Sequence, residues 1–419
     1  MISRRQLLWA APVAATAQVR KTPPTRPAPA WTVWGGPGRD FRVSSAGLAA
    51  KWPAGGPPKV WSRTLGEDGY SGISVENNIL YSGFRRGPNE VFTALSAADG
   101  KTIWEHSTPA PFRNAYQDRV GPGPYAMPQL IGNLAFVAGA TGIVHALDKK
   151  TGKVIWKHDL YREFGATRME YGYSCHGLPY RDTIIYLAGG LDKAIISFRQ
   201  ADGGVVYARH TFSNAHSSPL LIQVGGLEQV AILHATEALA INPINGDIQW
   251  RHPHKTDYGL AIATPVWNGK DLLLVSSAYN TGSRMLELTR TGDRTSVKEA
   301  WRDQKLQIQF GTVVSQGEHL IGSSGHRGPA FLTMFEWRTG RLAWQNRDFA
   351  KAHVIAADGK LILLDEDGNL ALASATPQAL TVHSKASVLT SLSWTPPTLA
   401  GSRLYARDRH NLTVFELGA

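Results

Sequence analysis

The sequence predicts an all-β fold: an eight-bladed β-propeller of four-stranded blades, closed by N- and C-terminal strands that share one blade. Three observations lead to this prediction. A sequence motif that ends in tryptophan recurs along the 419 residues. A small or polar segment followed by an apolar strand precedes the copies of this motif. The two chain ends supply complementary strands. Glycine occurs 42 times and tryptophan 13 times, which fits a chain with frequent turns and a recurring large aromatic residue.

Each copy of the recurring phrase predicts a β-hairpin. In the clearest copy, residues 146–156, one strand ends near Asp148, Thr151-Gly152 forms a tight turn, and a second strand leads to Trp156. Glycine suits the turn because it tolerates positive φ. An aromatic residue at a fixed distance from the turn points the same way in every copy, so we expect it to pack between neighbouring sheets. The equivalent positions are Trp61, Trp104, Trp156, Tyr207, Trp250, Trp301 and Trp344, with a degenerate copy near His383.

These positions give a count of eight blades. The C-terminal segments 403–405 and 412–415 supply inner strands without an outer one, and segment 58–61 supplies an outer strand without inner ones. We expect these segments to form one blade, because an open ring would leave two unpaired sheet edges. A seven-bladed ring with one worn unit outside it is the alternative.

The N-terminus predicts export. Residues 1–17 combine the pair Arg4-Arg5, an apolar stretch from Leu7 and small residues at Ala15 and Ala17, which is the pattern of a Tat-like signal peptide. Residues 18–30 are Pro-rich and predict a flexible lead-in, and residues 31–419 predict a single propeller domain. We therefore expect a periplasmic or secreted protein that does not span a membrane. The alternative for the N-terminus is a disordered cytoplasmic segment.

Charge and cysteine content restrict the partners. The formal net charge is +11, but lysine and arginine form no run of four or more, so we expect no nucleic-acid partner. Cys175 is the only cysteine, which excludes an intramolecular disulfide and a Cys-rich zinc site. We expect a monomer with no resident metal.

The hairpin phrase resembles a known repeat. Residues 146–156 match every fixed position of Ala-x-Asp-x-x-Thr-Gly-x-x-x-Trp, the motif of the pyrroloquinoline-quinone-like (PQQ-like) propeller repeat family. The opening segments 34–40 and 48–53 look like the lead-in of exported bacterial members, and the resemblance covers about residues 31–417. The family includes quinone alcohol dehydrogenases and an outer-membrane barrel-assembly lipoprotein, so the resemblance implies the fold and leaves the function open.

The sequence departs from both of these relatives. The dehydrogenases of the family stack their quinone on a ring formed by two adjacent cysteines, which the lone Cys175 cannot form. They also hold calcium with Glu, Asn and Asp ligands, and no motif here matches those ligands residue by residue. The assembly lipoprotein carries its lipid on a first mature cysteine, which is absent near residue 18.

Residues at the starts of the inner strands face the axial channel of a propeller, so they are the candidate ligand site. We expect an aromatic, histidine-bearing funnel, helped by arginines of two long inter-blade loops. The alternative is that these aromatic residues only close the channel. The candidates are Tyr70, Tyr125, Tyr173, His176, His216, Phe310, His353 and Trp394, with Arg113, Arg119 and Arg168 from the loops.

Other motifs are weaker. Segment 172–177 superficially resembles a nucleophile elbow, but His176 stands where that motif needs glycine, and no helix pattern follows. His252 and His254 provide only two metal ligands, and Cys175 fits a small buried residue better than a nucleophile. Acidic residues in the loops could bind calcium, although they lack ligand spacing; they are Glu67, Asp68 and Glu170. No catalytic residue is identified.

Two functions remain. The first is a non-catalytic scaffold that presents its loops to a protein or glycan ligand. The second is an oxidoreductase dependent on PQQ or a related quinone, with calcium, whose site lacks the cysteine pair. Hydrolase or lyase chemistry is a smaller third alternative.

Overall fold

The computed structural model describes residues 29–418 except residues 45, 115, 327, 329 and 391. The predicted signal peptide (1–17) and all but the last two residues of the lead-in (18–30) lie outside the described residues.

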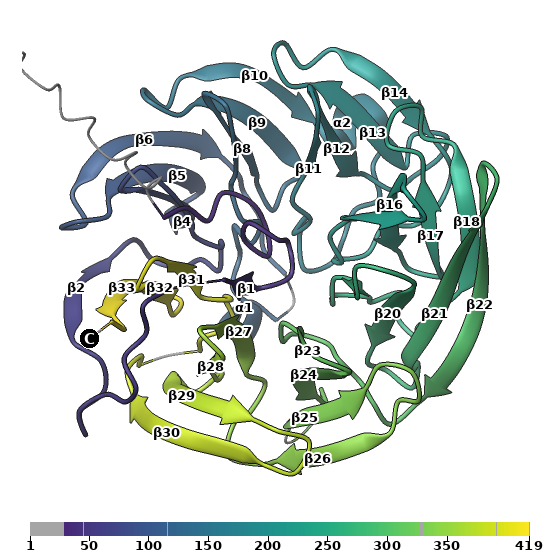
Figure 1. Ribbon diagram of the computed structural model, residues 1–419. Helices are drawn as coiled ribbons and strands as arrows, with labels where there is room; N and C mark the ends of the chain where they lie inside the picture. Colours follow the sequence, from purple (N-terminus) through teal and green to yellow (C-terminus); the bar gives the residue numbers. More distant parts are fainter. Residues whose placement is uncertain are drawn as a thin grey trace, which may run out of the picture.

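Eight β-sheets stand around a central axis, which confirms the predicted eight-bladed propeller (Figure 1). We number the blades in chain order by their innermost strand.

Blades 1 to 4 each contain four consecutive antiparallel strands. Their bounds, from the inside outward, are β3 Ser74–Glu76, β4 Ile79–Arg86, β5 Asn89–Ser96 and β6 Thr102–Pro109; β7 Gln129–Ile131, β8 Leu134–Ala138, β9 Ile143–Asp148 and β10 Val154–Asp159; β11 Leu178–Tyr180, β12 Thr183–Leu187, β13 Ile195–Arg199 and β14 Val205–Arg209; and β15 Leu220–Val224, β16 Leu227–Leu233, β17 Glu237–Ile241 and β18 Ile248–Pro253.

Blades 5 to 8 complete the ring. Their bounds are β19 Val266–Trp267, β20 Leu272–Ser277, β21 Gly282–Thr291 and β22 Arg294–Asp303; β23 Val314–Gln316, β24 His319–Ser324, β25 Phe331–Glu336 and β26 Leu342–Asn346; β27 His353–Ala357, β28 Lys360–Leu364, β29 Asn369–Ala375 and β30 Leu380–Ser387; and β31 Thr398–Ala400, β32 Arg403–Arg407 and β33 Asn411–Glu416 with β2 Lys59–Thr64. The helices among the described residues are α1 Gln117–Val120 and α2 Leu160–Phe164, and neither is long and apolar enough to span a membrane.

Blade 8 closes the ring as predicted. Strand β2 pairs antiparallel with β33, and Trp61 lies opposite Val414. The sheet order β2-β33-β32-β31 places the early strand outermost, so the last three strands of the chain receive their outer partner from its beginning.

Blade 7 differs from the predicted four strands. A fifth strand, β1 Arg42–Val43, pairs in parallel with the inner strand β27. The physical reason is that β27 exposes an inner edge toward the axis, and the N-terminal segment passes close enough to bond with it.

Inner and outer strands differ in burial because of their place in the ring. Inner strands such as β12 are buried on both faces between neighbouring blades and read as continuous apolar runs. The outer strand β2 alternates between half-buried and exposed residues. The core is thus a set of apolar layers between blades.

The recurring aromatic residue joins each blade to the next. The Nε1–H of Trp104 donates to the carbonyl of Lys149 in blade 2 at 2.8 Å, and the Nε1–H of Trp156 donates to Gln200 in blade 3 at 2.8 Å. Four more repeat residues donate a side-chain hydrogen bond to a backbone carbonyl of the next blade: Trp61 to Ala97, Tyr207 to Pro243, Trp301 to Trp337 and Trp344 to Thr376. This confirms that the repeat residue packs between sheets.

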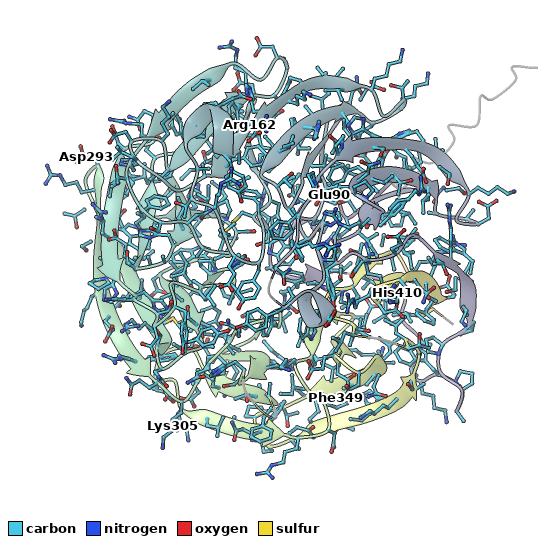
Figure 2. The ribbon with its side chains drawn as sticks, turned by 180° about the vertical axis from the view of Figure 1, so that it is seen from behind. Glu90, Arg162, Asp293, Lys305, Phe349 and His410 are labelled. Carbon is cyan, nitrogen blue, oxygen red and sulfur yellow. The ribbon has the colours of Figure 1, made fainter. Side chains whose placement is uncertain are left out.

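Two positions depart from this rule. Strands β21 and β22 form a longer hairpin, whose tip at Asp293 lies at the outer edge of the ring (Figure 2), so the turn of blade 5 lies beyond the reach of Trp250. Trp250 instead donates to Gln229 of its own blade at 2.9 Å. His383, the degenerate copy, is exposed, and the buried Trp52 of the N-terminal segment donates its backbone N–H to Ser384 at 2.7 Å on the same strand.

Candidate functional site: an aromatic cavity on the axis

A cavity of about 1350 Å³ occupies the axis of the ring. Loops that precede the inner strands form one end, which we call the rim. The N-terminal segment 31–43 lies at the other end, which we call the floor, and its residues Trp34 and 38–42 line the cavity. The cavity is larger than the roughly 300–1,000 Å³ typical of small-molecule sites.

The floor is built from the N-terminal segment, which crosses the middle of the ring (Figure 1). Trp31 pairs with Val75 of β3 through two backbone hydrogen bonds, and the carbonyl of Thr32 accepts from Leu130 of β7 at 2.8 Å. On the far side β1 pairs with β27, and the Arg42 guanidinium donates to the carbonyl of Ser315 in blade 6. The segment therefore bonds to blades on opposite sides of the axis.

Trp34 forms the central surface of the floor. Its Nε1–H donates to Thr264 Oγ1 at 3.1 Å, and its backbone N–H donates to Gln129 Oε1 at 3.1 Å. Phe41 packs edge-on against its ring at 5.2 Å, and the imidazole of His176 lies 4.5 Å from it, centroid to centroid. The indole is thus fixed from several directions while it lines the cavity.

Four aromatic side chains form an arc along the rim. They precede the inner strands of blades 6, 8, 1 and 2. The Phe310 and Trp394 rings stack at 5.3 Å, Trp394 and Tyr70 at 5.9 Å, and Tyr70 and Tyr125 at 6.5 Å. Interplanar angles of 13–25° keep the four rings nearly parallel. The arc is a continuous aromatic surface contributed by blades far apart in sequence.

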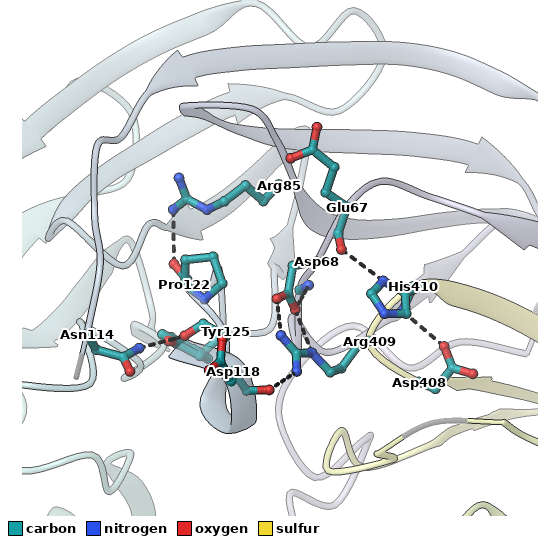
Figure 3. A network of polar contacts seen from close by, with 12 residues as sticks. Glu67, Asp68, Arg85, Asn114, Asp118, Pro122, Tyr125, Asp408, Arg409 and His410 are labelled. Atoms are coloured by element: carbon teal, nitrogen blue, oxygen red, sulfur yellow. Dashed lines mark hydrogen bonds and ion pairs between the residues drawn. The ribbon is translucent and has the colours of Figure 1, made fainter. Parts of the chain in front are cut away.

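Buried polar contacts hold the rim in place (Figure 3). Arg85 donates to the carbonyls of Ala110 and Pro122 at 2.8 and 2.9 Å, which fastens the loop between blades 1 and 2 at both ends. Arg409 of blade 8 bonds to the Asp68 carboxylate and to the carbonyl of Asp118 in α1. This loop carries Tyr125 and is therefore positioned by charged groups of two other blade segments.

Several charged side chains of the cavity wall contact other protein groups. Arg39 donates to the carbonyl of Pro179 at 3.3 Å, and Arg168 lies over the Tyr161 ring at 4.9 Å. Lys351 bonds to both oxygens of Glu366 at 2.7 Å. The carboxylates that line the cavity are Asp40 and Glu170.

Two buried polar side chains of the residues around the cavity have side-chain nitrogens without a hydrogen-bond partner among the described residues. His176 is 8% exposed, and neither ring nitrogen is bonded. Burial, with a smaller contribution from Arg39, lowers the pKa of His176 to about 3, so the ring is neutral at pH 7. Gln309 is fully buried; its Oε1 accepts from the backbone N–H of Ala278 at 3.0 Å, and its Nε2 is unbonded.

The structure brings most predicted site residues together. Those that line the cavity are Tyr70, Tyr125, Arg168, His176, His216, Phe310 and Trp394. Nδ1 of His216 and Oγ of Ser174 are joined by a hydrogen bond of 2.9 Å. Burial lowers the pKa of His216 to about 4.

Three predicted residues do not line the cavity, which corrects the sequence expectation for them. Tyr173 is fully buried in the core and donates to the carbonyl of Leu187 at 3.0 Å. His353 is buried behind the rim, where Nε2 donates to the carbonyl of Trp394 at 2.9 Å. Arg113 is exposed on the loop outside the cavity, and the side chain of Arg119 lies outside the described part of the structure.

The weaker motifs remain dispersed. Cys175 is fully buried, its thiol donates to the carbonyl of Ala215 at 3.1 Å, and burial raises its pKa to about 12, which leaves no thiolate nucleophile at neutral pH. His254 bonds to Ser277 and Arg284, whereas His252 lies near Glu299. These two histidines therefore do not point at one metal position.

Comparison with known proteins places the fold in a family. A family model described as outer membrane protein assembly factor BamB matches residues 53–159 and 89–346. The chain belongs to this family. It is 23% identical over 267 residues to the outer membrane protein assembly factor BamB of Yersinia pestis, a match that covers 58% of this chain and 63% of that relative.

Solved structures agree on the fold. The crystal structure of BamB from Moraxella catarrhalis superposes with a TM-score of 0.58 at 16% identity, over 86% of this chain and 99% of that chain. The quinohemoprotein alcohol dehydrogenase of Comamonas testosteroni superposes with a TM-score of 0.63 at 11% identity, over 93% and 81% of the two chains. At these identities the likeness shows a shared propeller alone.

The residues of this BamB-family cavity do not fit a quinone with calcium. The cysteine ring of the quinone alcohol dehydrogenases needs two adjacent thiols, and the one cysteine of this chain, Cys175, is bonded inside the core. Among the described residues no group of three or more His, Cys, Asp or Glu side chains could hold a metal ion. Asp68, one of the acids considered for calcium, is instead paired with Arg409.

Sequence reasoning missed the floor and part of the wall. The segment around Trp34 resembled the N-terminal lead-in of PQQ-like propeller proteins, but nothing in its local sequence pattern indicates that it crosses the axis of the ring. Gln309 precedes Phe310, at the start of an inner strand, and that position could have included it among the candidates.

Proposed function

We propose that this chain is a non-catalytic binding scaffold outside the cytoplasm and that its ligand site is the rim end of the axial cavity. The observation that carries the proposal is the arc of Phe310, Trp394, Tyr70 and Tyr125, a wide aromatic surface at one end of the axial cavity. Aromatic surfaces with a few fixed polar groups are typical of binding sites.

Family membership supports a scaffold and a location near the outer membrane. The relatives named as assembly factors act with other proteins, which favours a binding role for this chain as well. The poor fit to quinone and calcium disfavours the oxidoreductase alternative.

A photo-crosslinking experiment tests the scaffold function. Tyr258 lines the cavity and is 64% exposed, whereas Leu191 is 72% exposed and lies outside the cavity. Each is replaced in turn by p-benzoylphenylalanine, and the protein is irradiated in the cells that make it. We expect covalent adducts, seen by intact-mass spectrometry, from position 258 and none from position 191.

Equal adducts at both positions, or none at position 258, would contradict the proposal. A parallel titration with pyrroloquinoline quinone and Ca²⁺ tests the alternative, because a stoichiometric bound chromophore together with dye-linked alcohol oxidation would establish the enzyme instead.

A further inference from the structure

We propose that Arg39 of the floor segment binds a carboxylate group of the ligand, so that the axial cavity holds an aromatic or apolar ligand with one negative charge. This inference rests on the proposed function, because it names the class of ligand that the scaffold binds. A free carboxylic acid and the C-terminal end of a peptide both present this chemistry.

Arg39 extends into the ring to the level of the inner strands. Its Nη2 donates to the carbonyl of Pro179, the middle residue of β11, at 3.3 Å. A guanidinium has five N–H donors, so one bond leaves four of them available. Nε and Nη1 bond to no described residue, and neither atom is fully enclosed by protein. Since the side chain lines the cavity, these donors are accessible to a ligand.

Arg39 also has no acidic partner. The carboxylate of Asp40, the next residue, accepts from the backbone N–H of Arg42 at 3.2 Å, and no carboxylate of the described residues forms an ion pair with the Arg39 guanidinium. Burial lowers the pKa of Arg39, and no acidic group opposes this effect. Because a half-buried cation has lost part of its hydration, a carboxylate in the plane of the guanidinium would compensate for that loss.

The other charged groups of the wall favour a single negative charge on the ligand. The cations that line the cavity are Arg39, Arg42, Arg168 and Lys351, and the acids are Asp40 and Glu170. Lys351 is neutralised by Glu366, to which it bonds at 2.7 Å, so three cations remain against two carboxylates. One carboxylate on the ligand balances this excess, whereas a phosphate group carries a charge of about −1.5 to −2 and would be repelled more strongly by the two acids.

Among these cations, the position of Arg39 suits recognition best. Arg42 and Arg168 are exposed, where water and salt weaken an ion pair, and Arg168 already lies over the Tyr161 ring. Arg39 is half-buried, so an ion pair that forms there is weakened less.

The floor segment fixes the guanidinium in advance. The backbone N–H of Arg39 donates to the carbonyl of Gly36 at 3.0 Å and that of Phe41 to the carbonyl of Gly35 at 2.8 Å, which folds residues 35–41 into a tight loop. Arg39 has a φ of 58°, and a methyl group added at Gly35 would come within 2.5 Å of its backbone carbonyl carbon. The loop is therefore held in one conformation, which lowers the entropy cost of binding.

An aromatic surface lies beside this cation. The charge of Arg39 helps to lower the pKa of His176, which places the two side chains near each other, and the His176 ring lies 4.5 Å from that of Trp34. Trp34 also lines the cavity. A ligand whose carboxylate bonds to Arg39 can thus pack an aromatic or apolar part on Trp34.

Titration calorimetry of the full chain tests the inference with two acids and their neutral amides. The acids are 3-phenylpropionate, which is a free carboxylic acid, and the peptide N-acetyl-Ala-Ala-Phe, which presents a chain end. Arg39→Gln removes the charge, and Arg39→Lys keeps the charge but lacks the planar fork. The matched control is Arg181→Gln, because Arg181 has a similar φ of 50° but is exposed outside the cavity.

We expect at least one acid to bind saturably and about ten-fold or more tightly than its amide. Arg39→Gln should abolish this preference, Arg39→Lys should keep it in weakened form, and Arg181→Gln should leave it unchanged. A variant that only loosens the floor would weaken acid and amide alike, so the preference reports on the charge of Arg39. Thermal unfolding verifies that each variant is folded, and Arg39→Lys decides the result if Arg39→Gln is not.

Failure of both acids to bind, equal affinities of acid and amide, or an undiminished preference in Arg39→Gln would overturn the carboxylate assignment. A preference that disappears in Arg168→Gln instead would also overturn it, because the exposed arginine would then bind the acid. If position 258 still forms adducts in any of these cases, the scaffold function stands and only the ligand class is wrong. If position 258 gives no adducts either, both proposals fail.

Discussion

The indole of Trp156, in blade 2, lies directly over Gly203, in the outer hairpin turn of blade 3. A methyl group added at Gly203 would come within 2.8 Å of Trp156 Cδ2. The same relationship joins Trp104 to Gly152 and Trp301 to Gly340. A bulky aromatic residue in one blade therefore requires glycine in the turn of the next, which explains why the two residues recur together in the repeat.

Replacement of Trp156 by alanine should destabilise the ring. Trp156 is 7% exposed and packs between Phe136 and Phe198, so Trp156→Ala should lower the free energy of unfolding by about 3–5 kcal/mol. Ile155 on the same strand is 49% exposed, and Ile155→Ala should cost about 0.5 kcal/mol or less. Denaturant unfolding measures both. A loss below about 1 kcal/mol for Trp156→Ala would contradict the packing role.

The glycine beneath the indole can be tested against a glycine in open space. Gly203 and Gly132 both have positive φ, at 74° and 52°, but a side chain at Gly132 would meet nothing within 4 Å. Gly132→Ala should therefore cost only the conformational strain, about 1–2 kcal/mol, and Gly203→Ala should cost clearly more. Equal losses of unfolding free energy would show that the contact with Trp156 is unimportant.

Truncation after Leu399 should unfold the whole ring. It removes β32 and β33 and leaves β2 without its partner, so two blade edges become exposed. We expect an insoluble chain or a large fall in the thermal midpoint relative to full length. A soluble truncated protein with an unchanged midpoint would show that the shared blade does not close the ring.

The buried Glu90 should make stability depend on pH. It lies inside the ring (Figure 2), and burial raises its pKa to about 7, against weaker lowering by the Ala140 N–H and Arg85. Between pH 4.5 and 7 the folded state then holds a proton that the unfolded state has released, so this residue's contribution to stability falls as pH rises through that window.

Glu90→Gln should remove this fall, which is on the order of 3 kcal/mol for a shift from 4.5 to about 7. Unfolding at pH 5 and pH 8 should show the variant gaining stability relative to the unsubstituted protein at the higher pH. The exposed Glu170→Gln serves as the control. An identical change with pH in all three proteins would mean that Glu90 is ionised throughout this range.

Export is tested by the arginine pair. If residues 1–17 direct Tat-type export, replacing Arg4 and Arg5 with lysine should retain the protein in the cytoplasm, and the exported protein should begin at Gln18. Cell fractionation and N-terminal sequencing measure both. Normal export of the double variant would point to a general secretory signal.

The sequence was informative wherever a local pattern repeats. The spacing of the repeated motif predicted three features: the hairpin turns, the aromatic residues that join blades, and the blade shared by both chain ends. It could do so because each blade is a local unit of adjacent strands. Loop positions such as Tyr70 and Trp394 were found because many residues just before the inner strands face the axis. Tyr173 was misassigned because it lies in the loop before β11, where no periodicity tells whether a side chain points to the axis or into the core.

Long-range placement could not be predicted in the same way. Trp34 bonds to Gln129 and Thr264, and the second of these is 230 residues away in the chain. Such contacts depend on where a non-repeating segment lies in the completed ring, and no periodicity records that. The unbonded state of His176 and Gln309 likewise depends on the whole cavity wall.

The floor segment also imposes an order on assembly. Residues 31–43 are made early, yet the strand with which β1 pairs, β27, is made more than 300 residues later. Strand β2 must likewise wait for β33. These N-terminal segments therefore cannot take their final places until most of the ring has been synthesised, so the wall of the axial cavity is completed only late in synthesis.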